Sequence, residues 1–161
     1  MAAIPIDGDG RFSGYASLFG RLDGGGDIVM PGAFARSLKQ RRERIRLLFQ
    51  HDPTEPVGIW ETIGEDSHGL FVAGRLVGGV PRADALRRLI EARALDGLSI
   101  GFRTVKATRD RPSGHRRLWQ IELFEISIVT FPMLEEARIA RSHELTTGAA
   151  IMAATQTLRS N

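Results

Sequence analysis

The sequence predicts a mainly β protein with a few α-helices, in which one mixed sheet is rolled or closed and helices lie outside it. Most periodic segments alternate apolar and polar residues as strands do, whereas only two have helical spacing. Strands and helices do not alternate regularly, which argues against a parallel sheet built from repeated strand–helix units. The 161 residues suit a single domain with a sizeable core.

The first third of the chain contains two expected strands and one helix. Residues 11–19 alternate as a strand, and the glycine-rich stretch 22–28 follows as a turn. Pro31 opens a helix, because proline lacks an amide donor that would have no partner in a first helical turn. Residues 44–52 then form a strand with alternate apolar residues on one face.

The remaining elements are mostly strands. Strands are expected over 56–63 and 69–77, joined by a hairpin loop, and a helix over 81–95 with Leu86, Leu89, Ile90 and Ala94 on one stripe. Further strands are expected over 97–107, 116–122 and 123–132, the last having the strongest strand pattern. We divide the chain into a domain over 1–140 and a tail over 141–161 that is polar or alanine-rich.

Composition excludes several classes of protein. No apolar run approaches the length of a membrane span, and the first residues lack the pattern of a secretory signal. The absence of cysteine excludes disulfides, thiol catalysis and cysteine-based metal sites, and fits a cytoplasmic setting.

Basic residues exceed acidic ones by 22 to 19, and the densest basic run is 39–44. It lies at the end of the expected first helix, where the helix dipole favours cations, so a solvated helix end is the preferred interpretation. A nucleic-acid-binding barrel is the weaker alternative, because Tyr15 is the only tyrosine and few aromatic residues are available for stacking.

The stretch "GLSIG" at 97–101 matches the G-x-S-x-G turn on which many hydrolases carry a nucleophilic serine. That turn needs a strand before the serine and a helix after it, and here the order is reversed. Ser99 is therefore expected within a strand. The flanking Gly97 and Gly101 indicate that another backbone approaches closely, and a peptide substrate would be such a backbone.

A nucleophilic serine needs a base, and His51 is the preferred candidate. It ends the expected strand 44–52 on the same face as Leu47 and Phe49, and Asp52 and Pro53 follow it as a strand stop. The other histidines lie in expected loops or in the tail: His68, His115 and His143.

A carboxylate that orients the histidine would complete such a site. Glu125 interrupts the apolar run "LFEISIV", with Phe124, Ile126 and Ile128 expected on one face and Glu125 and Ser127 on the other. Glu122 and Asp52 are weaker candidates for the same position.

Five segments together resemble the prohead (capsid maturation) proteases of tailed phages and related gene transfer agents. In chain order they are "GYASLFGRLDGGGDIVMPGAF", "LLFQHDPTEPVGIW", "GLFVAGRL", "LDGLSIGFR" and "ELFEISIVTFPMLEEA". The resemblance runs from about Gly14 to Ala137, and the order and spacing of the segments make it specific.

The resemblance implies a serine endopeptidase with a fold like herpesvirus assemblin, a closed or partly closed β-barrel surrounded by helices. It carries the family's serine onto Ser99, its histidine onto His51 and its acid onto Glu125. Assemblin-like sites use a second histidine in the third position, which keeps His115 and His68 as alternatives. No metal or cofactor is implied.

The implied partners are the major capsid protein with its scaffolding segment, inside an assembling procapsid, and other copies of the protease itself. The tail after Arg141 is a candidate for self-removal. The alternative function is a non-catalytic capsid-assembly or scaffolding module.

Overall fold

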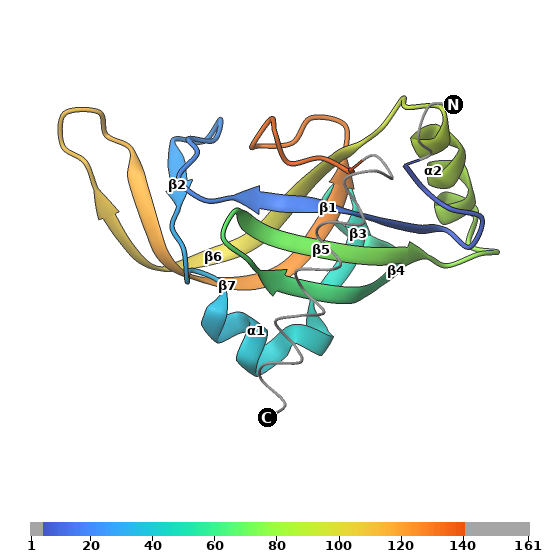
Figure 1. Ribbon diagram of the computed structural model, residues 1–161, viewed down its shortest axis with the longest axis horizontal. Helices are drawn as coiled ribbons and strands as arrows, with labels where there is room; N and C mark the ends of the chain where they lie inside the picture. The colour runs from blue at the N-terminus through green and yellow to red at the C-terminus, as the bar shows by residue number, and fades with distance from the viewer. Residues whose placement is uncertain (1–4, 141–161) are drawn as a thin grey trace.

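The computed structural model describes residues 5–140, which form one curled sheet and two helices (Figure 1). The strands are β1 (Arg11–Leu18), β2 (Asp27–Val29), β3 (Arg46–Phe49), β4 (Asp52–Glu65), β5 (Gly69–Leu76), β6 (Gly97–Arg109) and β7 (Arg116–Val129). The helices are α1 (Ala35–Arg41), a 3-10 turn η1 (Arg42–Arg44) and α2 (Pro81–Glu91). Neither α1 nor α2 has the length and apolar character needed to cross a membrane.

β7 is the strand around which the sheet is organised. The path through the sheet is β1-β5-β4-β3-β7-β2, and β6 pairs with β7 along its other edge. β7 therefore has an antiparallel partner in β6 and two parallel partners, β3 at one end and β2 at the other. In Figure 1, β1, β5 and β4 cross over β6 and β7, so the sheet curls into a half-barrel. This mainly β architecture with few helices is the fold class that the sequence predicts.

A short segment after β7 lies between the two outer strands β1 and β6. Ile139 forms a bridge with Gly14 of β1, and Arg138 forms one with Gly97 of β6. The amide of Ala140 donates to the carbonyl of Ser13 at 2.8 Å, and the amide of Leu98 donates to the carbonyl of Ala137 at 2.9 Å. Segment 137–140 thus links the edges of the sheet.

The core fills the inside of the curled sheet with aliphatic side chains from every long strand. Ile126 and Ile128 of β7 and Leu98 of β6 are fully buried, as are Leu47 of β3 and Val72 of β5 (0–1% exposed). Full burial of each such side chain stabilises the fold by roughly 1.5–3 kcal/mol. This core holds β3, β6 and β7, the strands that position the candidate site.

The first helix begins later than expected, at Ala35 rather than Pro31, and residues 31–34 form turns. Ser37 fixes α1 to β7, because its hydroxyl donates to the carbonyl of Ile121 at 3.0 Å and accepts from the amide of Leu123 at 2.9 Å.

The second helix was expected over 81–95 and ends at Glu91. Arg93 has a φ of 59°, and the amides of Arg93 and Ala94 donate back to the carbonyls of Ile90 and Leu89. This left-handed cap satisfies the last carbonyls and terminates the helix, although no glycine marks it in the sequence. Leu89, expected on the buried stripe, is 44% exposed.

Three strand boundaries also differ from expectation. The segments expected over 116–122 and 123–132 are one strand, β7, which continues through an irregularity and ends at Val129. β2 falls at the end of the stretch expected to be only a turn. The strand expected over 44–52 is limited to β3, because η1 precedes it and a tight turn at Gln50 and His51 follows it.

Candidate active site

Ser99 lies near the start of β6, directly opposite Ser127 on β7. Ser99 is 6% exposed, and within residues 5–140 its hydroxyl has no hydrogen-bond partner. The preceding Leu98 is fully buried in the core, so Ser99 projects from the other face of β6, as the alternation predicts.

The two glycines that flank Ser99 leave room for other parts of this chain. A Cβ atom at Gly97 would lie 2.5 Å from the carbonyl oxygen of Val129 and 2.9 Å from the ring of Pro132. A Cβ atom at Gly101 would lie 2.1 Å from Oε1 of Glu125. Gly101 therefore leaves the space in which the Glu125 carboxylate lies.

His51 is in a tight turn and not at the end of a strand, which corrects the sequence interpretation. Gln50 and His51 have φ values of 53° and 58°, and Phe49 pairs with Asp52 across the turn. Two successive positive φ values characterise the two-residue hairpin turn that suits the twist of paired strands. Asp52 therefore begins β4, and the Asp52-Pro53 pair does not stop the sheet.

The turn that carries His51 is anchored to the end of β7. The amide of Gln50 donates to the carbonyl of Ile128 at 3.0 Å. Its side-chain amide donates to the hydroxyl of Thr130 at 2.7 Å and accepts from the Thr130 amide at 3.3 Å. A non-glycine residue in this left-handed region costs about 1–3 kcal/mol, so these contacts hold an unfavourable conformation in place.

Glu125 and His51 are in contact, although 74 positions separate them in the sequence. The Oε1 atom of Glu125 is the hydrogen-bond partner of His51 Nδ1, and its Oε2 atom accepts from the hydroxyl of Ser127 at 2.7 Å. The Glu125 side chain is 12% exposed, compared with 43% for His51. The carboxylate is thus held between a histidine and a serine.

A bulge in β7 sets the direction of Glu125. Gly101 pairs with Glu125 and the next residue, Phe102, pairs with Leu123, so Phe124 is an extra residue without a partner. Phe124 is 39% exposed and lies beneath the guanidinium group of Arg41, 4.4 Å from the ring centroid. The expectation that Phe124 shares the buried face of Ile126 and Ile128 is therefore wrong.

The charge state of His51 follows from its partner. The hydrogen bond that His51 donates to Glu125 raises the pKa of His51 above its usual 6.5, partial burial opposes that rise, and the negative charge of Glu125 adds to it. In the neutral ring the proton on Nδ1 is shared with Glu125, which leaves Nε2 as the acceptor. The pair can therefore take up a proton at Nε2 and stabilise the resulting imidazolium.

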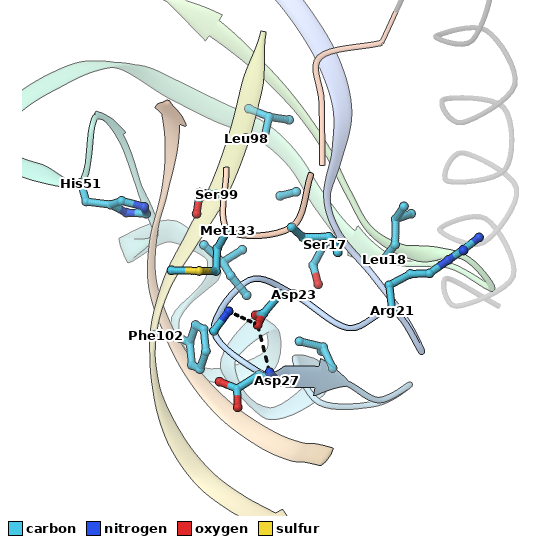
Figure 2. A pocket seen from close by; sticks show the side chains of 15 residues that line it. Ser17, Leu18, Arg21, Asp23, Asp27, His51, Leu98, Ser99, Phe102 and Met133 are labelled. Carbon is cyan, nitrogen blue, oxygen red and sulfur yellow. Dashed lines mark hydrogen bonds between the residues drawn. The ribbon is translucent and has the colours of Figure 1, made fainter. Parts of the chain in front are cut away.

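His51 and Ser99 line the same groove, which has a volume of about 170 Å³. Figure 2 shows the His51 ring pointing toward the hydroxyl of Ser99. Its other lining side chains are largely apolar and include Leu98, Phe102 and Met133. An imidazole with a free Nε2 that faces a serine hydroxyl can act as a general base toward it.

Two loops form one wall of this groove. The glycine-rich loop between β1 and β2 contacts the segment after β7, where the amide of Gly24 donates to the carbonyl of Met133 at 2.8 Å. Asp23 points its carboxylate into its own loop and accepts from the amides of Gly25 and Asp27, both at 2.9 Å (Figure 2). Burial raises the pKa of Asp23, and these amides oppose the rise.

The alternative candidates do not line the groove. His68 is in the loop after β4, with a side chain that is 66% exposed, 3.8 Å from Asp66. His115 is in the loop between β6 and β7. Glu122 forms ion pairs with Arg41 and Arg103. The carboxylate of Asp52, although it follows His51 directly, accepts from the amide and hydroxyl of Thr54. His143 and the proposed tail, 141–161, lie outside the described residues.

Sequence reasoning missed Ser127, Gln50 and Thr130 as contributors to the site. Ser127 had been placed on the face of Glu125, but its contact with the His51 backbone depends on the parallel pairing of β3 with β7. Gln50 and Thr130 give no signal in the sequence, because their contact arises only from the turn. Among residues 5–140, no group of three or more histidine and acidic side chains is arranged to hold a metal ion.

Comparison with known proteins identifies the family of the chain. Residues 3–149 match the family model described as Caudovirus prohead serine protease. The chain belongs to this family. It is 38% identical over 142 residues to the prohead protease of Enterobacteria phage HK97, an alignment that covers 85% of this chain and 63% of that protein. The chain thus spans less than two thirds of the length of that prohead protease.

Two solved structures have a similar fold. The capsid assembly protease of bacteriophage T4 superposes with a TM-score of 0.62 at 14% identity, covering 80% of this chain and 89% of that one. A KSHV protease in complex with a hexapeptide phosphonate inhibitor superposes with a TM-score of 0.55 at 14% identity, covering 81% and 63%. This chain thus shares its fold with a phage capsid assembly protease and with a herpesvirus protease.

Proposed function

We propose that this chain is a serine endopeptidase in which Ser99 is the nucleophile, His51 the base and Glu125 the residue that orients His51. One observation carries the proposal. The ring of His51 is bound to Glu125 through Nδ1 and lines one groove together with Ser99, whose hydroxyl has no hydrogen-bond partner among residues 5–140. Membership of the prohead serine protease family supports it.

The reaction follows from this arrangement. Nε2 of His51 takes the hydroxyl proton of Ser99 as Oγ attacks the scissile carbonyl carbon, and the carbonyl oxygen becomes an oxyanion. The imidazolium then gives its proton to the leaving amine, and the peptide bond breaks to leave an acyl-serine. Water, deprotonated by His51, hydrolyses this ester and restores the serine. Glu125 stabilises the imidazolium in both stages, which agrees with the raised pKa of His51.

We infer that the substrates are the major capsid protein with its scaffolding segment, and the protease itself, inside an assembling procapsid. The HK97 relative is named a prohead protease and the T4 neighbour a capsid assembly protease, which supports this class of substrate. In this scheme 1–140 is the protease domain, and the tail from Arg141 is a site of self-cleavage. Segment 137–140 also completes the curled sheet as a barrel, with α1 and α2 outside it.

The test is cleavage of the capsid precursor by purified protein, with new termini mapped by mass spectrometry. Ser99→Ala and His51→Ala should abolish cleavage and keep the fold, because they remove the nucleophile or the base. Ser13→Ala is the matched control, since Ser13 is also a buried strand serine and its hydroxyl has no partner in the described part of the chain.

A serine-directed phosphonate should label Ser99. A non-catalytic assembly module predicts no labelling, and wild-type processing by Ser99→Ala would refute the assignment.

A further inference from the structure

Ser127 is a fully buried residue on β7 whose hydroxyl connects two parts of the candidate site. Its Oγ accepts from the backbone amide of His51 at 3.0 Å and donates to Oε2 of Glu125 at 2.7 Å. Ser127 is 0% exposed. Neither contact is needed to hold β6, β7 and β3 together, since these strands have their own backbone pairing.

The direction of these hydrogen bonds is fixed by chemistry. A backbone amide can only donate, so the Ser127 hydroxyl accepts from His51 and has one proton to give. That proton is donated to Oε2 of Glu125, which leaves Oε1 to accept from Nδ1 of His51. The contacts form a closed ring that begins at the backbone of His51, passes through Ser127 and Glu125, and returns to the His51 side chain.

We propose that Ser127 is a positioning residue that holds the His51 backbone and the Glu125 carboxylate at once, and so keeps the proton of the neutral ring on Nδ1. It touches neither the groove nor, in the mechanism above, the reacting atoms. Its action is indirect: with the proton kept on Nδ1, Nε2 is free to face Ser99. This inference rests on the proposed function for its kinetic consequence but not for the geometry of the ring.

Ser127 and Ser99 are direct neighbours across the β6–β7 pair, which makes their difference informative. Both are buried serines on the same face of adjacent strands. The hydroxyl of Ser127 has two hydrogen bonds, whereas that of Ser99 has none within residues 5–140. The two serines therefore have different roles in the proposed site: Ser127 holds His51 in place, and Ser99 is the hydroxyl toward which His51 points.

Few other charged groups bear on His51. The carboxylate of Asp52, on the same turn, is bound to Thr54. From the opposite wall of the groove, Asp23 is bound to its own loop amides, and Arg21 lines the same groove. Asp27 also lines it, and its carboxylate is paired with Arg116. Glu125 is thus the carboxylate that sets the proton affinity of His51, and a residue that holds Glu125 should be visible in that affinity.

The experiment compares Ser127→Ala with wild type, Ser13→Ala and Ser127→Thr in a peptide-cleavage assay over a range of pH. We expect Ser127→Ala to lower kcat by about 10- to 100-fold, as small misplacements of catalytic groups do, with KM within about twofold. Neutral His51 is the active form, so the acid limb of kcat/KM lies above the usual histidine value in wild type. In Ser127→Ala it should move to lower pH, because the ring loses its fixed contact with Glu125. Ser127→Thr keeps the hydroxyl and should therefore have the kcat and the acid limb of the wild type. Ser13→Ala should change neither kcat nor the acid limb.

A second measurement does not depend on catalysis or on whether threonine fits the buried position. The His51 ring is titrated by NMR in Ser99→Ala with and without Ser127→Ala, and we expect the second change to lower the pKa of His51. An unchanged kcat, acid limb and ring titration would overturn the proposal, as would a loss equal to that of Ser13→Ala. If Ser99→Ala itself cleaves normally, the proposed function fails, and the ring titration still decides the role of Ser127.

Discussion

Gly101 shows how one missing side chain shapes the site. The Glu125 carboxylate occupies the volume in which a Cβ atom at 101 would lie, with only 2.1 Å between that atom and Oε1. The sequence marks this glycine within "GLSIG" but gives no indication that its neighbour is a carboxylate from the next strand. The space is evident only once the register places Gly101 opposite Glu125.

We expect Gly101→Ala to displace the Glu125 carboxylate from His51 and to lower kcat for peptide cleavage by about 100-fold, the scale of a misplaced catalytic group. The measurement is steady-state cleavage together with thermal unfolding. Gly78→Ala is the matched control, because a Cβ atom there meets nothing within 4 Å. Equal activity in the two variants would show that the position of Glu125 is not critical.

The sequence predicts the direction of a side chain where that direction depends only on alternation along one strand. Ser99, opposite in direction to Leu98, and Glu125, opposite to Ile126, follow this rule. Phe124 does not, because a bulge adds one residue to β7 and shifts the alternation. Bulges depend on the pairing of two strands, so neither strand alone reveals them.

At the scale of elements, the turn between β3 and β4 decides where His51 lies. Alternation over 44–49 suggested a strand through His51, since Gln50 and His51 lack the asparagine or glycine that usually marks a two-residue turn. The conformation is instead imposed by contacts with β7, through Ile128 and Thr130. Such tertiary control of a turn is not visible in the local sequence.

We expect Gln50→Gly to change the free energy of unfolding little but to lower the rate of cleavage. Glycine relieves a backbone cost of about 1–3 kcal/mol, yet it removes two hydrogen bonds worth about 0.5–1.5 kcal/mol each and adds unfolded-state entropy. The activity should fall because the turn that carries His51 loses its attachment to Thr130.

Urea unfolding and peptide cleavage measure the two effects separately. Thr130→Val is the companion variant, because it removes the acceptor for the Gln50 side chain and leaves the backbone angle unchanged. Full activity in both variants would contradict a role for this attachment.

At the scale of the whole molecule, segment 137–140 links the edge strands β1 and β6. Strand order and closure were the least predictable features, since β1 and β6 are far apart in sequence and their link is supplied by a third segment. The sequence predicted a rolled or closed sheet from the predominance of strands and from the lack of regular alternation between strands and helices. It contained no signal for which segment would lie between the outer strands.

We expect Gly14→Ala to separate this segment from β1, because a Cβ atom at position 14 would lie 2.2 Å from the carbonyl oxygen of Arg138. The cost should be about 1–3 kcal/mol of unfolding free energy, typical of overpacking. Urea unfolding measures this loss of unfolding free energy. Faster hydrogen exchange of the Ile139 and Ala140 amides would show that the disturbance lies at this segment. Gly8→Ala, at an open position, should leave both unchanged. Normal exchange in Gly14→Ala would show that the link tolerates the added methyl group.

The parallel pairing of β3 with β7 has a consequence for how the protein is made. A chain leaving the ribosome presents His51 well before Glu125 and Ser127, and their strands pair only after about residue 128 has emerged. Pairings between such distant segments form late in folding. An unfinished polypeptide therefore contains His51 and Ser99 but lacks the contact between His51 and Glu125, which can form only after translation has passed position 125.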